Sequence, residues 1–231
     1  TLDNGTVLTV PDGYRFLDAA QGRLLVEHLW GNPRNPDFLG LLLPQKVGPL
    51  DNDVLGIEIS GDASGHLSEA DANQLNYHLL LRQMKKHLRE ENIWRSQNGY
   101  DIVTAMKWAF PPYYRSQDNT LHLPRILHFA QQRAVLNYEM RILTRNGALC
   151  LTAIADLGQL TAIQQLMPEL VKKIHIAAGN NYFDFNPKTD QFAAWAQQAK
   201  MVSRILNPQY FLHSVANSWL FLLVCVCLVL F

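Results

Sequence analysis

Cysteine is scarce in this sequence, with three residues among 231. Cys225 and Cys227 lie within an apolar run near the end, and Cys150 stands alone. The rest of the chain therefore has no cysteine pair for a disulfide, and no Cys or His spacing of the kind that binds zinc. This composition fits the cytosol and a bacterial periplasm equally well.

An excess of charge of either sign is also missing. Lys and Arg number 20, and Asp and Glu number 20, so the formal net charge is zero. A nucleic-acid-binding domain carries a basic footprint, and this chain has none. We expect no nucleic-acid partner.

The familiar catalytic motifs are absent too. The sequence contains no GxSxG, P-loop, HExxH or GxGxxG pattern, so the usual hydrolase, nucleotide-binding and zinc-protease signatures are missing. We assign no catalytic residue, no cofactor and no metal ligand from motifs.

A long apolar run is present near the end. Residues 219–231 read WLFLLVCVCLVLF, without charge, Gly or Pro. Counted from Phe211, the stretch reaches about 20 residues, the length of a membrane-spanning helix. A buried core helix is the alternative, but such a helix usually keeps an amphipathic period, which this run lacks. We predict a transmembrane anchor in contact with the lipid bilayer, formed mainly by Trp219, Leu220, Phe221, Leu222, Leu223, Val224, Leu228 and Phe231.

The anchor divides the chain into a soluble domain, residues 1–206, and a hinge with the membrane helix, residues 207–231. Lys200 and Arg204 precede the run, which weakly favours a cytoplasmic domain because cations prefer that side. The opening TLDNGTVLTVPDG is polar and is not a signal peptide. Either a signal has been cleaved or the run is a tail anchor.

Hydrophobic patterning predicts an α+β domain, with helices packed on an antiparallel sheet. The expected strands are residues 6–10, 40–44, 54–60, 101–110, 135–144 and 148–155, with 174–179 as an edge strand. The expected helices begin at residues 18, 68, 156 and 189, and residues 124–130 fit either a short strand or a helical turn. In the last helix, Phe192, Trp195, Ala199 and Val202 are expected to share a face.

Local signals support several of these elements. Asp18, Ser68 and Asp156 precede helical patterns as N-caps. Asn146-Gly147 separates two strand patterns, which predicts a hairpin with a two-residue turn at positive φ.

Three sets of residues are candidates for a site. His122, His128 and Asp118 could share a metal, although surface or hydrogen-bonded histidines are the simpler interpretation. Asp184 and Asp190 could form a general acid–base pair, although a turn and a helix start explain them as well. Aromatic side chains could line a binding surface, for which the candidates are Trp108, Tyr113, Tyr114 and Tyr182 together with Asp184.

Several sequence blocks resemble a known family. GTVLTVPDGYRFLD, MKWAFPPYY, VLNYEMRILTRNGALCLTAIA and GNNYFDFNPKTDQFAAW occur in that order, followed by a terminal apolar helix. They are similar to the bacterial uncharacterised membrane-anchored protein family, domain of unknown function 2167. The resemblance implies a cleaved signal, a single-pass anchor in the bacterial inner membrane and a periplasmic domain. This chain departs from the family's pattern near Tyr114, where members tend to have an acid, and at LTR in place of LGR.

Two classes of function stay open. The first is a non-catalytic binding or assembly domain with a protein partner in the membrane or envelope. The second is an unrecognised hydrolase or metal enzyme built on Asp184, Asp190 and the histidines. A cytoplasm-facing, tail-anchored adaptor is the alternative in location.

Overall fold

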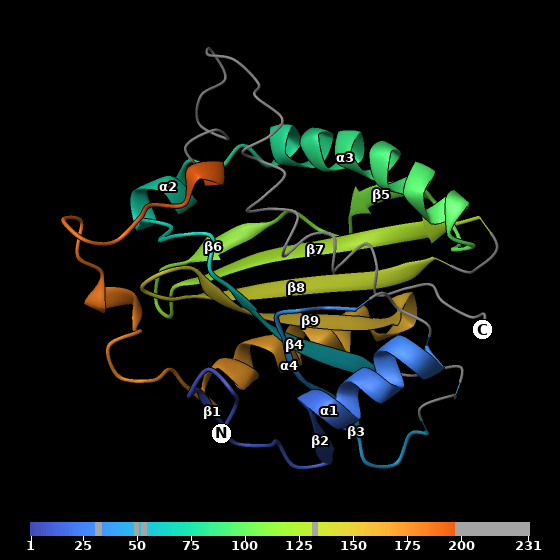
Figure 1. Cartoon of the computed structure of the whole chain (residues 1–231), viewed down its shortest axis with the longest axis horizontal. Coiled ribbons are helices and arrows are strands. Elements are labelled where there is room, and N and C mark those ends of the chain that lie inside the picture. Colours follow the sequence, from blue (N-terminus) through green and yellow to red (C-terminus); the bar gives the residue numbers. More distant parts are fainter. Residues whose placement is uncertain (31–33, 49–50, 52–54, 131–133, 197–231) are drawn as a thin grey trace.

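The fold is built on a large antiparallel sheet, shown in Figure 1. The computed structural model describes residues 1–30, 34–48, 51, 55–130 and 134–196. Its strands are β1 (Val7–Leu8), β2 (Tyr14–Asp18), β3 (Phe38–Pro44), β4 (Gly56–Asp62), β5 (Val103–Trp108), β6 (Tyr113–Arg115), β7 (Thr120–Phe129), β8 (Val135–Leu143), β9 (Ala148–Asp156) and β10 (Ile174–His175). Its helices are α1 (Ala19–Arg23), the π-helix η1 (Leu24–Leu29), α2 (Glu69–Asn73), α3 (Tyr77–Gln97), the 3₁₀-helix η2 (Leu157–Gln159), α4 (Leu160–Val171) and the 3₁₀-helix η3 (Tyr182–Asp184).

The main sheet has the strand order β2-β3-β4-β9-β8-β7-β5, with β6 paired to β7. Every pairing is antiparallel. A separate two-stranded sheet joins β1 to β10. The predicted α+β class is confirmed for the described residues, and the predicted anchor lies outside them.

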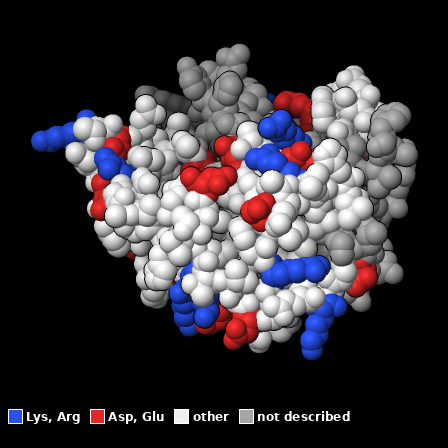
Figure 2. Space-filling model, turned by 60° about the horizontal axis from the view of Figure 1, so that its bottom comes forward, with Lys and Arg blue, Asp and Glu red and all other residues white. Residues whose placement is uncertain are grey.

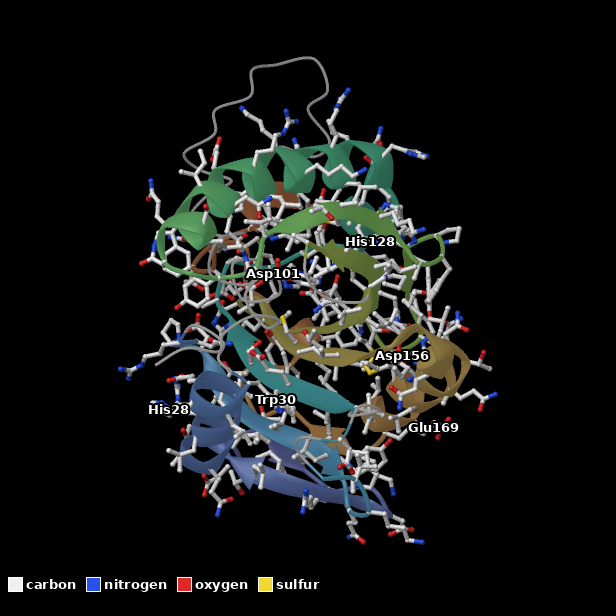
Figure 3. All side chains as sticks on the ribbon, turned by 90° about the vertical axis from the view of Figure 1, so that its right-hand side faces the viewer. His28, Trp30, Asp101, His128, Asp156 and Glu169 are labelled. Carbon is white, nitrogen blue, oxygen red and sulfur yellow. The ribbon has the colours of Figure 1, made fainter. Side chains whose placement is uncertain are left out.

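Helices cover both faces of the sheet. Ile163, Met167 and Leu170 of α4 pack against the apolar residues of β4, β8 and β9 on one face. On the other face, α3 packs at the β5–β7 end and α1 with η1 packs on β3. Figure 3, a view rotated by 90°, shows α3 and α1 at opposite ends of the curved sheet.

The predicted caps are confirmed. The Asp18 side chain accepts a hydrogen bond from Gln21 N at 2.8 Å, and Ser68 Oγ accepts one from Asp71 N at 3.1 Å. Asp156 forms a capping box with Gln159 ahead of α4. These short polar side chains satisfy backbone N–H groups that have no partner within the helix.

The predicted hairpin exists, but its turn differs from the expected one. Leu143 pairs with Ala148, so four residues connect β8 and β9 in place of two. Asn146 has no positive φ, whereas Gly147 has a φ of 158°, a backbone conformation that L side chains rarely adopt. The glycine is required for a second reason: a Cβ at Gly147 would lie 1.8 Å from the carbonyl oxygen of Asp62.

Other expectations were wrong in detail. The helix from residue 68 is two helices, α2 and α3, because Asn76 caps a second helix start. Residues 120–129 form one long strand, and the short strands β2 and β6 were missed. No helix begins at Thr189: that residue lies in a turn, Phe192 forms a bridge with His66, and the helical residues begin at Ala194. Phe192 therefore precedes them, and Ala199 and Val202 of the predicted face lie outside the described residues.

Candidate functional site

An open groove of about 680 Å³ lies between the α2–α3 connection and the β5–β6 connection. This volume is within the range of small-ligand sites. Its lining is mostly apolar and consists of Asn73, Gln74, Leu75, Asn76, Tyr77, His78, Trp108, Phe110, Pro111 and Pro112.

Local sequence sets the shape of this groove. Asn76 Oδ1 accepts a hydrogen bond from Leu79 N at 2.9 Å, which starts α3 directly after α2 and leaves a sharp corner between the helices. Trp108 Nε1 donates to the backbone oxygen of Tyr77 at 3.3 Å, which ties β5 to that corner. Burial raises the pKa of Tyr77 to about 12, so its phenol stays protonated at neutral pH.

Free hydrogen-bonding groups line the groove beside the aromatic rings. The side chains of Asn73, Gln74 and His78 are exposed. None of them forms a side-chain hydrogen bond within the described part of the chain. These groups can therefore bind a ligand without first breaking an internal contact.

The five predicted binding-surface residues do not form one surface. Trp108 lines the groove. Tyr113 and Tyr114 are successive residues of β6 and point to opposite faces of the sheet. The Tyr114 hydroxyl donates to Asn119 Oδ1 at 2.9 Å, and the Tyr182 hydroxyl donates to Leu67 O at 3.2 Å. Asp184 closes the turn at η3 by accepting from Asn181 N at 2.9 Å.

Tyr113 belongs to a hydrogen-bonded chain that sequence analysis did not predict. Its ring stacks on His122 at 4.3 Å between centroids, and its hydroxyl lies 3.4 Å from that of Tyr138. His122 Nδ1 lies 2.7 Å from the Tyr138 hydroxyl, and its Nε2 lies 2.9 Å from Thr120 Oγ1. Thr120 in turn donates to Asp118 at 2.8 Å.

In this series of hydrogen bonds, both ring nitrogens of His122 have a partner. Because Thr120 donates to Asp118, it accepts from His122 Nε2–H, and Tyr138 donates to Nδ1. Burial, reinforced by the charge of Arg115, lowers the pKa of His122 to about 4, so the ring is neutral at physiological pH. The arrangement satisfies buried polar groups and leaves His122 no lone pair for a metal.

The proposed metal set does not converge. Asp118 and His122 meet through Thr120, but His128 lies six residues further along β7, about 20 Å away on an extended strand. Figure 3 shows His128 on that strand, beneath α3. In the parts of the chain that the structure describes, no group of three His, Cys, Asp or Glu side chains could hold a metal ion.

The proposed acid–base pair does not form either. Asp190 is bound by Arg145 Nε at 2.7 Å and Nη2 at 3.0 Å, and by the backbone N–H of Asn186 at 2.8 Å. Hydrogen bonding from Arg145 holds the pKa of Asp190 well below its usual range. Asp190 is therefore ionised and engaged, and it joins the hairpin turn to the loop that contains Asp184.

A buried ionic network on the α3-side face of the sheet was also missed. Arg125 Nη2 donates to Asn137 at 2.6 Å and to Glu139 at 3.2 Å. Arg141 pairs with Glu139 at 2.7 Å and with Asp62 at 3.0 Å. Beside it, burial raises the pKa of the Cys150 thiol well above its usual value, so the thiol stays protonated and unreactive.

Among the described residues, no helix is both long and apolar enough to cross a bilayer.

Comparison with protein families decides the membership of this chain. A family model described as "Protein of unknown function (DUF2167)" matches residues 2–230. The chain belongs to this family. The resemblance inferred from the sequence blocks is thereby confirmed.

The chain was also compared with curated proteins and with solved structures. No curated protein matches the sequence. Among solved structures, the chain is similar to the solution structure of cyanobacterial PsbP (CyanoP) from Synechocystis sp. PCC 6803, with a TM-score of 0.43 and 8% sequence identity. The match covers 75% of this chain and 88% of that chain.

Proposed function

We propose that this protein is a non-catalytic binding or assembly domain, held at the bacterial inner membrane by residues 207–231 with residues 1–206 in the periplasm. Its partner would be a component of the membrane or envelope that occupies the groove beside Trp108. One observation carries the proposal. The groove has polar side chains that are available to a ligand, whereas the candidate catalytic residues Asp184, Asp190 and His122 are held by internal hydrogen bonds.

The groove offers polar groups that no internal contact uses. Asn73 and Gln74 are exposed and form no side-chain hydrogen bond to the residues that the structure describes, and Trp108 presents a large apolar ring to the same groove. A few polar groups on an apolar lining are typical of a binding site.

The candidate catalytic residues named from the sequence are engaged elsewhere. Asp190 is paired with Arg145, Asp184 closes a turn, and both nitrogens of His122 are hydrogen-bonded. An enzyme needs an acid, base or nucleophile within reach of a ligand. Within the described residues, the groove is lined by no carboxylate and no cysteine, so its histidine, His78, has neither an acidic partner nor a thiol nucleophile beside it in the lining.

The surface charge supports the absence of a nucleic-acid partner from the proposal. Figure 2 shows acidic and basic side chains interspersed on the face it presents, with no broad basic patch. The formal net charge of zero supports the same conclusion.

Site-specific photo-crosslinking in living cells tests the binding role. A photoreactive amino acid placed at Gln74 in the full chain should give a crosslinked product, because this side chain points into the groove region without an internal partner. The matched control is the same substitution at Gln164, an exposed residue of α4 on the opposite face of the sheet. Equal product from both positions would contradict a role for the groove.

Protease treatment of spheroplasts tests the location. Protease added outside the inner membrane should digest residues 1–206 in intact spheroplasts. Protection until the membrane is permeabilised would instead support a cytoplasm-facing, tail-anchored adaptor.

A further inference from the structure

We infer that the groove between the α2–α3 corner and the β5–β6 connection binds a neutral carbohydrate chain. This inference rests on the proposed function and names the ligand class for the same groove. It is carried by three properties of the lining: its lack of charge, its aromatic rings and its free amides.

The first property excludes charged ligands. Among the described residues that line the groove, none is Asp, Glu, Lys or Arg, although such residues make up 17% of the chain. A phosphate, carboxylate or ammonium group placed there would lose water without gaining an opposite charge. The ligand that fits is therefore neutral.

The second property concerns the aromatic rings. The indole N–H of Trp108 is already donated to Tyr77 O at 3.3 Å, so the indole offers the groove its apolar ring and no hydrogen bond. Phe110, Pro111 and Pro112 extend this apolar wall. The C–H groups on the flat face of a sugar ring are weakly positive, and they pack well against the electron-rich face of an aromatic ring.

The third property concerns the amides on the opposite wall. Asn73 and Gln74 each present a carbonyl oxygen and an NH2 group, and neither side chain forms a hydrogen bond to another described residue. Asn76 also lines the groove, while its side-chain oxygen caps α3. A sugar hydroxyl both donates and accepts, so an amide that does the same can bind two adjacent hydroxyls at once.

A proline-rich peptide is the competing occupant, because it also packs on aromatic rings. Peptide carbonyls on such a ligand require donors from the aromatic wall, and the indole donor of Trp108 is used by Tyr77. The ligand with hydroxyl groups fits the free amides better. A proline-rich decapeptide is therefore titrated alongside the sugars.

The test measures binding of defined sugars to the full chain. The protein is kept in a detergent without a sugar headgroup, and cellotriose, maltotriose and chitotriose are titrated calorimetrically to millimolar concentrations. Trigalacturonic acid serves as the charged counterpart of the neutral trisaccharides. Sedimentation with insoluble chitin and with purified cell-wall sacculi distinguishes a free oligosaccharide from a structural glycan as the source.

Binding of at least one neutral trisaccharide or glycan, without binding of trigalacturonic acid, is expected. Gln74→Ala and Asn73→Ala should each weaken that binding about fivefold, the effect of losing one hydrogen bond. Gln164→Ala, which removes an equally exposed amide from α4, should leave affinity unchanged. Thermal melts of all three variants check that the fold is intact.

Three other outcomes would overturn the inference, and they distinguish a wrong ligand class, a wrong site and a wrong proposed function. Binding of a proline-rich decapeptide that Gln74→Ala weakens, with no sugar binding, would refute the carbohydrate and retain the groove as a binding site. Sugar binding that Asn73→Ala and Gln74→Ala leave unchanged would place the site elsewhere. The absence of any binding, together with equal crosslinking at positions 74 and 164, would refute both the ligand class and the proposed function.

Discussion

Gly147 lies in the turn between β8 and β9, against the backbone at the end of β4. A Cβ atom there would meet the Asp62 carbonyl oxygen at 1.8 Å and its carbon at 2.7 Å. Backbone atoms cannot move aside as the tip of a flexible side chain does. Asp62 is also bound to Arg141, so a shift at this point would disturb the buried ionic network.

Gly147→Ala is therefore expected to lower the free energy of unfolding by about 1–3 kcal/mol, the usual effect of overpacking. Urea denaturation of the wild type and the variant measures this difference. Gly61→Ala is the matched control: Gly61 precedes Asp62 on β4, and a Cβ there would meet no atom within 4 Å. The control should stay within about 0.5 kcal/mol of wild type. Equal midpoints for both variants and wild type would contradict the close approach.

At the scale of elements, the groove depends on the corner between α2 and α3. The corner exists because Asn76 caps α3 instead of allowing α2 to continue. Ala72 of α2, Leu75 in the connection, and Leu79, Met84 and Leu88 of α3 are buried, so both helices remain attached to the core.

Asn76→Ala should lower the free energy of unfolding by about 1 kcal/mol through loss of this cap. Asn76→Asp keeps an acceptor at the same atom and is favoured by the positive end of the helix, so it should stay near wild type. Thermal or urea unfolding followed by circular dichroism compares the three proteins. An Asn76→Ala protein as stable as Asn76→Asp would show that the cap does not hold the corner.

A second element-scale prediction concerns Glu91 within α3. Burial raises its pKa from 4.5 to about 7, against the attraction of Arg95 at 2.9 Å. Because the pKa of Glu91 is higher in the folded state than in the unfolded state, its contribution to the free energy of unfolding is complete below pH 4.5. That contribution is lost as the pH rises through 7. The free energy of unfolding should therefore fall from pH 5 to pH 8, by up to roughly 3 kcal/mol from this group.

Glu91→Gln should flatten the pH dependence of unfolding in that window. Glu90→Gln is the control, since the Glu90 side chain is 56% exposed and forms only a 3.8 Å contact with His87. A slope in Glu91→Gln equal to that of wild type would show that Glu91 is ionised throughout the window.

The elements differ in how far the sequence predicts them. Asp18, Ser68 and the strands on either side of Gly147 are recognisable because caps and alternating apolar residues are local signals. Asn76 carried the same cap signal and could have been recognised. Strands β2 and β6 were missed because five and three residues are too few to show a period.

The candidate site is less predictable for a physical reason. Trp108 was expected to bind, but its groove neighbours Asn73 and Gln74 come from a segment about thirty residues earlier, and only packing brings them together. The sequence did not predict the buried ionic network of Arg125, Glu139 and Arg141. In a strand that alternates apolar and polar residues, the polar face is normally exposed to solvent. Here that face is buried as well, at 2% exposure or less.

At the scale of the whole molecule, the proposal depends on the anchor at residues 219–231. Alkaline carbonate extraction should leave the full chain in the membrane pellet, because the run is long enough to span the bilayer. Leu223→Arg places a charge near its centre, at a cost of about 2.5–3.5 kcal/mol for insertion, and should increase the released fraction. Release of the unmodified chain into the supernatant would refute the anchor.

The pairing of β4 with β9 has a consequence for how the chain acquires its structure. Gly56 pairs with Ile154, whereas β2-β3-β4 and β7-β8-β9 each pair between neighbours in sequence. A chain emerging from its N-terminus, from a ribosome or a secretion channel, can therefore assemble the first meander early but must hold its β4 edge open until β9 appears. Unpaired edges of this kind recruit other strands. The interval between the emergence of β4 and of β9 is thus the period when the nascent protein most needs shielding from its own copies.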